Sequence, residues 1–210
     1  LRVLDGAVAV FCAVGGVEPQ SETVWRQADR YRVPRIAFIN KCDRVGADPD
    51  RVLRQIRDRL KANPLMLHMP HVLEDEFNGI IDLVRMRSRV WDDESLGATF
   101  HEEEVPAHLR DEAELHRDAL IEALSDVDDA ICEKYLDKQP IEAAEIMAAV
   151  RRVTLAMKAV PVFIGSAFRN KGVHNLLDGI VDYLPSPLDV PPVKGTLPDD
   201  EAVEVVRHAS

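Results

Sequence analysis

Three short apolar runs constrain the fold of this chain of 210 residues more than any other feature of its sequence. They are rich in Val, Ile and Phe, lack a regular polar alternation, and cover residues 7–14, 35–39 and 160–164. Strands that are apolar on both faces are typical of a parallel sheet covered by helices. Segments with helical spacing of apolar residues follow the runs, at residues 21–31, 48–60 and 173–184. This alternation predicts an α/β fold with a partial, doubly wound, mostly parallel sheet.

The charge is distributed unevenly along the chain. Residues 64–158 contain 22 Asp and Glu against 10 Lys and Arg, a net charge of −12, whereas the whole chain carries −11. Such a shift is typical of a domain inserted into a near-neutral scaffold. We therefore predict a scaffold at residues 1–63 and 159–190, an acidic α+β insert at 64–158, and a linker at 191–210.

The composition also narrows the functional classes. A net charge of −11 and a pI near 5.1 argue against a protein that binds DNA through its phosphate backbone. No apolar run reaches the ~18 residues that a membrane span needs. The three cysteines form neither a disulfide framework nor a zinc spacing, and we interpret His68, His71 and His101 as surface histidines without a metal. We expect a cytoplasmic protein that binds no membrane, DNA or metal ion through this chain.

The loops that follow the second and third apolar runs carry the informative residues. In an open α/β sheet, ligands bind beyond the carboxyl ends of the strands. The second run ends in Asn40-Lys41-Cys42-Asp43, the N-K-x-D pattern that reads guanine in GTPases. The carboxylate of Asp43 can accept hydrogen bonds from the ring N–H and the exocyclic amine of guanine, a pair that adenine does not offer. Asn40 can bond the base and brace the neighbouring loop, and the stem of Lys41 can cover the base plane.

The third run is followed by Ser166-Ala167-Phe168, where the amide of Ala167 can donate to the guanine O6. A site built from such groups discriminates strongly, because the wrong base leaves buried polar groups unpaired. The order of the two motifs, each after an apolar run, favours a guanine site over the alternative that Asn40 and Asp43 only form a turn and a cap. The predicted guanine-binding residues are Asn40, Lys41, Asp43, Ser166, Ala167 and Phe168.

Several stretches around these loops resemble bacterial elongation factor G. They include CAVGGVEPQSETVWRQA at residues 12–28, VPRIAFINKCDR at 33–44, FNGIIDL at 77–83, PVFIGSAFRNKGV at 161–173 and DYLPSP at 182–187. The resemblance covers nearly the whole chain. It implies a monomeric translational GTPase that binds GTP and hydrolyses it to drive translocation on the ribosome, in contact with ribosomal RNA and the stalk protein. It also implies that residues 64–158 are the insert called G′ and that the tail leads to a β-barrel domain.

The phosphate-binding half of a GTPase is missing from this sequence. No G-x-x-x-x-G-K-S/T pattern occurs, so the phosphate cradle and its Mg²⁺-binding hydroxyl are absent. The family's switch motif lies upstream of the stretch that matches residues 2–8. We therefore expect a fragment, the carboxyl-terminal part of a G domain, which binds GDP weakly and has no catalytic residue for hydrolysis. Magnesium would belong to the intact protein.

The insert suggests a second kind of function. On the helix predicted near residues 107–125, one face carries Asp111, Glu114, Asp118 and Glu122. The resemblance implies a contact between this insert and a basic domain of the stalk protein, which an acidic face would steer. The alternatives are a solvated helix face and a fragment without activity of its own. We interpret Lys171 as an exposed loop lysine rather than as a contact to RNA or phosphate.

Overall fold

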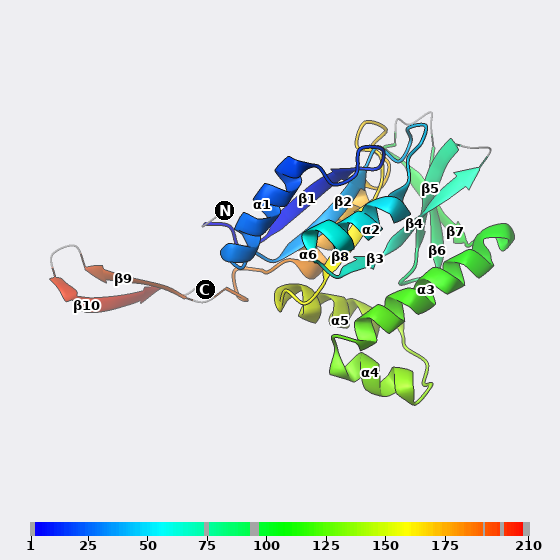
Figure 1. The fold of residues 1–210 in the computed structure, drawn as a ribbon. Coiled ribbons are helices and arrows are strands. Elements are labelled where there is room, and N and C mark those ends of the chain that lie inside the picture. Colours follow the sequence, from blue (N-terminus) through cyan, green and yellow to red (C-terminus); the bar gives the residue numbers. More distant parts are fainter. Residues whose placement is uncertain (1–2, 74–75, 93–96, 191, 198–199, 208–210) are drawn as a thin grey trace.

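The computed structural model describes residues 3–73, 76–92, 97–190, 192–197 and 200–207. Its scaffold is a parallel sheet of four strands in the order β1-β2-β8-β3 (Figure 1). The strands are β1 (Ala7–Cys12), β2 (Arg35–Asn40), β3 (Pro64–Met66) and β8 (Val160–Ile164). The predicted α/β class with a mostly parallel sheet and an inserted subdomain is confirmed.

Helices cover both faces of this sheet. Alternate residues of β2 enter two different cores: Ala37 and Ile39 face α1 (Pro19–Arg30) and α2 (Pro49–Leu60). Phe38, on the opposite face, packs in the core that includes residues of α5 (Ala143–Leu155) and α6 (Val173–Tyr183). All five residues of β8 are buried, which explains why its sequence is apolar without alternation.

The insert consists of an antiparallel sheet followed by helices, of which α5 is the last. Its strands lie in the order β4-β5-β6-β7. They are β4 (His68–Leu73), β5 (Glu76–Asp82), β6 (Arg87–Trp91) and β7 (Phe100–Glu104), and a 3-10 turn at Ala107–Leu109 leads into α3 (Arg110–Ser125) and α4 (Asp129–Leu136). The buried Leu67 joins the two sheets, because its N–H donates to Val162 O at 3.1 Å and its carbonyl accepts from Leu83 N at 3.0 Å.

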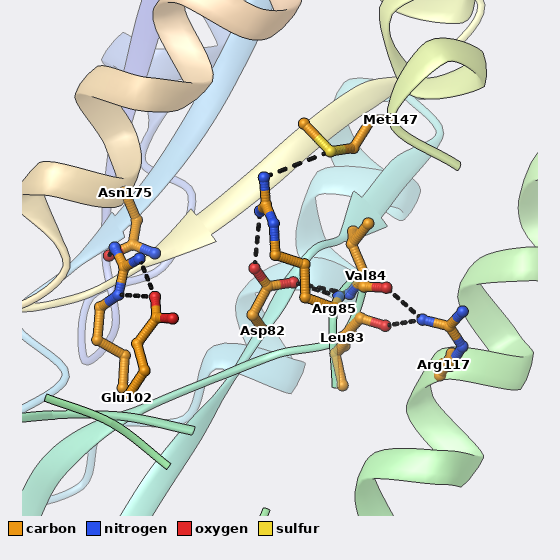
Figure 2. Close-up of polar contacts among 9 residues, drawn as sticks. Asp82, Leu83, Val84, Arg85, Glu102, Arg117, Met147 and Asn175 are labelled. Atoms are coloured by element: carbon orange, nitrogen blue, oxygen red, sulfur yellow. Dashed lines mark hydrogen bonds and ion pairs between the residues drawn. The ribbon is translucent and has the colours of Figure 1, made fainter. Parts of the chain in front are cut away.

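Two arginines fix the helices to the turn after β5, as Figure 2 shows. Arg117 of α3 donates to the carbonyls of Leu83, Val84 and Ile141. Arg85 pairs with Asp82 at 3.0 Å and donates to Met147 Sδ of α5 at 3.4 Å. The bonds from Arg117 supply donors to the carbonyls of Leu83 and Val84, which directly follow β5. The helices and the antiparallel sheet therefore form one packed subdomain.

Two elements lie in segments that the sequence analysis described otherwise. The range 64–158 includes β3, which hydrogen-bonds to the parallel sheet, and the tail contains a hairpin of β9 (Val193–Leu197) and β10 (Asp200–Arg207). In α1 the buried residues are Trp25 and Ala28. No helix among the described residues has the length and apolar character needed to cross a membrane.

Candidate functional site

The loops after β2 and β8 leave the parallel sheet at the same edge and stay side by side. Ile39 pairs with Ile164 in the sheet. Beyond the last paired residues, Gly165 N donates to Ile39 O at 3.0 Å and Cys42 N donates to Gly165 O at 3.1 Å. The backbone ladder thus extends into the loops, and it brings residues 40–43 next to residues 165–168.

The side chain of Asn40 ties these two loops together. Its Oδ1 accepts hydrogen bonds from Lys41 N at 2.7 Å and from Ala167 N at 2.9 Å. The bracing role that the sequence suggested for Asn40 is therefore present in the structure. The Ala167 amide, which we expected to donate to a guanine O6, is occupied by Asn40. The neighbouring amide of Phe168 donates no hydrogen bond to any residue that the structure describes, so it offers a second donor at this point.

Three other side chains of the two loops, those of Lys41, Asp43 and Phe168, are exposed or half-buried. Lys41 is exposed in a left-handed conformation with φ of 67°, and Phe168 is 91% exposed. The half-buried Asp43 carboxylate forms no ion pair or hydrogen bond within the described part of the chain. Its oxygens are therefore free to accept hydrogen bonds from a ligand.

Buried groups beneath these side chains hold the loop shapes. Ser166 is 1% exposed, and its hydroxyl accepts from Arg169 N at 3.3 Å. The thiol of Cys42 donates to Ile39 O at 3.3 Å, and burial raises its pKa to about 12. Neither side chain points to open solvent, so both act as parts of the support. For Cys42 this is a packing role, as is common for a buried thiol.

Lys171 is a residue for which the sequence interpretation was wrong. We expected an exposed loop lysine, but it is 5% exposed and its Nζ donates to the carbonyl of Phe77 at 3.1 Å. Phe77 lies on β5, 94 positions earlier in the chain. No local spacing around Lys171 indicates that the inserted sheet covers it, because the contact depends on the tertiary fold.

The loop after β1 is held by α2. Val17 N donates to Gln55 Oε1 at 2.7 Å, and Arg51 Nη2 donates to Ala13 O at 3.3 Å. A hydrogen bond from the Gly15 backbone lowers the pKa of the Cys12 thiol. The glycine-containing stretch that supports the family resemblance therefore serves here as a strand-to-helix connection held by side chains of α2.

The acidic residues predicted for partner binding lie together on α3. Asp111, Glu114, Asp118 and Glu122 are all exposed, and none pairs with a cation among the residues that the structure describes. The opposite face of the helix is buried through Ala113, Leu120 and Leu124. These four carboxylates therefore keep their negative charge exposed on one side of the helix, with no described Lys or Arg paired to them.

His101 is exposed, as we expected, but the other two histidines are not. His68 and His71 are buried, not at the surface, since β4 pairs with β5 and packs against the scaffold. His71 Nδ1 lies 2.9 Å from Ser88 Oγ, and His68 contacts the Phe163 ring edge-on at 5.1 Å between centroids. Burial lowers the pKa of His68 to about 4. Within the described ranges, no group of three or more His, Cys, Asp or Glu is placed to hold a metal ion.

Comparisons with known proteins agree with this geometry. The model of the family described as the elongation factor Tu GTP-binding domain matches residues 1–186. A crystal structure of a protein from Thermus thermophilus superposes with a TM-score of 0.79 at 26% sequence identity. The match covers 93% of this chain but only 29% of the Thermus chain.

Proposed function

The chain belongs to the family of the elongation factor Tu GTP-binding domain, a family of translational GTPases, and on that premise we propose that it contributes the guanine-recognising part of an elongation factor G-like protein. The observation that carries the proposal is the pair of loops joined by Asn40 at the carboxyl edge of the parallel sheet. The intact protein would bind GTP and hydrolyse it to drive translocation on the ribosome in the cytoplasm.

The residues fit a guanine base better than an adenine. The carboxylate of Asp43 has no protein partner among the described residues. It can therefore accept hydrogen bonds from both the ring N–H and the exocyclic amine of guanine. The Phe168 amide, or the Ala167 amide once released by Asn40, would donate to the guanine O6. Lys41 and the exposed ring of Phe168 would cover the flat faces of the base.

Phosphate and metal chemistry lie outside what this chain's residues support. The sequence has no G-x-x-x-x-G-K-S/T loop, and the described residues offer no metal-ligating cluster. Much of the affinity of GTPases for nucleotides comes from phosphate contacts in that loop. We therefore expect weak binding of GDP and no hydrolysis by this chain.

Ligand-observed NMR tests the proposal at weak affinity. Saturation transfer from the protein to GDP, with none to ADP at the same concentration, is the expected result. The variant Asp43→Ala serves as the matched control and should abolish transfer to GDP. Equal transfer to both nucleotides would show that the base is not read, and the guanine proposal would then be abandoned.

The unpaired carboxylates on α3 support a second candidate, a module that binds the ribosomal stalk protein. Replacing Asp111, Glu114, Asp118 and Glu122 by their amides should slow association with the stalk protein's C-terminal domain and remove its salt dependence. A variant with four exposed carboxylates neutralised elsewhere, at Asp5, Asp50, Asp58 and Glu133, controls for net charge. Equal effects of the two variants would refute a specific role for the α3 face.

A further inference from the structure

The loop of residues 166–171 is held from two sides. On the scaffold side, Asn40 Oδ1 accepts from Ala167 N at 2.9 Å. Within the loop, Ser166 and Lys171 exchange two backbone hydrogen bonds of 2.9 and 3.0 Å, and Asn170 N donates to Ala167 O at 3.2 Å. The conformation of the exposed residues Ala167 and Phe168 therefore depends on these hydrogen bonds, which end at Lys171.

The inserted sheet supplies the support on the other side. The buried ammonium of Lys171 donates to Phe77 O of β5 at 3.1 Å. Asn170 Nδ2 donates to the carbonyl of Gly97 at 3.2 Å. Gly97 has φ of 77°, a conformation that favours glycine. A Cβ at this position would lie 2.4 Å from Arg169 O, so the backbone of the turn before β7 packs directly against the backbone of the loop.

Two more contacts continue this interface into α6. Arg89 of β6 donates to Asn175 Oδ1 at 3.0 Å while its guanidinium pairs with Glu102 (Figure 2). The ring of Phe100 on β7 lies 5.8 Å from that of His174. Residues 170–175, which directly follow the candidate guanine loop, are thus contacted by the β5, β6 and β7 strands and by the turn at Gly97.

We propose that Lys171 is a positioning residue of the guanine site, through which the inserted sheet holds the 166–171 loop in its base-binding shape. The inference rests on the proposed guanine function and deepens it. A buried ammonium needs hydrogen-bond acceptors, so it is stable only where carbonyls such as that of Phe77 are fixed. Partner binding that shifts the insert would then change guanine affinity, and guanine would change partner affinity by the same factor.

The variant Lys171→Met tests this role, because it keeps the length of the stem and removes the donor. In the ligand-free chain, amide hydrogen exchange at Asn170 and Lys171 should rise roughly tenfold, the effect expected for the loss of the charged hydrogen bond to Phe77 O. The dissociation constant for GDP should rise by a similar factor. Exchange in β2 should remain near its wild-type rate, which a general structural role would not allow.

Lys158→Met is the matched control. Its Nζ also donates to a backbone carbonyl at 3.1 Å, that of Val127, but it precedes β8, whereas the 166–171 loop follows the opposite end of that strand. It should change neither the exchange of the loop nor the affinity for GDP. If Lys171→Met fails to fold, Asn170→Gly replaces it. Glycine accepts the φ of 54° at this position and removes only the bond to Gly97, so a smaller rise of about threefold is expected.

The outcomes separate the two proposals. A wild-type chain that does not respond to GDP refutes the guanine function, whatever the exchange of the loop shows. A wild-type chain that binds GDP, together with a Lys171→Met variant of unchanged affinity and unchanged loop exchange, refutes the role of Lys171 alone. A rise in exchange throughout the variant also refutes it, because Lys171 would then support the whole fold.

Discussion

Asn40→Ala is the substitution that separates the bracing of the loops from the reading of the base. It removes the Oδ1 acceptor of two backbone amides, Lys41 N at 2.7 Å and Ala167 N at 2.9 Å. At an exposed site each bond contributes about 0.5–1 kcal/mol, so the loss is roughly 1–2 kcal/mol. Because 1.4 kcal/mol corresponds to a factor of ten, the open form of the loop should become roughly 5 to 30 times more populated.

Amide hydrogen exchange of Ala167 in the ligand-free chain measures this change directly. Asn40→Asp is the matched control, since a carboxylate at the same place still accepts from both amides. Its exchange at Ala167 should stay near the wild-type rate, even though the loss of the amide group weakens binding of the base. Equal exchange in the wild type and in Asn40→Ala would refute the brace.

Three further predictions concern the base, a partly buried ion pair and a buried histidine. Asp43→Asn replaces an acceptor by a donor, so saturation transfer from the protein should move from GDP to xanthosine diphosphate, whose base has a carbonyl where guanine has an amine; no transfer to either would contradict the assigned contact. Asp128→Ala removes a bidentate pair with Arg152, at 2.9 Å for both bonds, and the N-cap bond from Ile131 N. Urea unfolding should therefore show that the free energy of unfolding falls by about 2 kcal/mol in Asp128→Ala and by about half of that in Asp128→Asn. The hydrogen bond from Arg152 lowers the pKa of Asp128, so this stabilisation is present above the unfolded pKa of the carboxyl and is lost as the pH falls through the folded one. Burial lowers the pKa of His68 from 6.5 to about 4. The folded chain therefore has its full stability above pH 6.5, where His68 is neutral, and up to about 3 kcal/mol of the free energy of unfolding is lost as the pH falls toward 4. His68→Phe should flatten the pH dependence of unfolding over that range, whereas His101→Gln should not.

The sequence was most informative where a single element determines its own surroundings. The buried strands β2 and β8 follow from runs that are apolar on both faces, and α2 begins where Asp48 and Pro49 predict it, with Asp48 Oδ1 accepting from Arg51 N at 2.8 Å. The edge strand β1 is the exception among the runs. Its Val10 is 57% exposed, because β1 has a neighbour on one side only in the described sheet.

The sequence was least informative where distant segments meet. The strand β3 has three residues and begins with proline, so it carries no strand pattern, yet it completes the sheet beside β8. Lys171 and His68 are polar residues, and no local pattern around them indicates that the packing of the inserted sheet buries them. The residues that would contact the base were identifiable from motifs, whereas the residues that support them depend on contacts between the scaffold and the insert.

The most direct test of the account is a titration of the chain with GDP, and separately with ADP, followed by backbone amide shifts. The account predicts saturable shifts with GDP alone, confined to residues 40–43 and 165–171. A folded, well-dispersed spectrum in which these amides do not respond to GDP would contradict it.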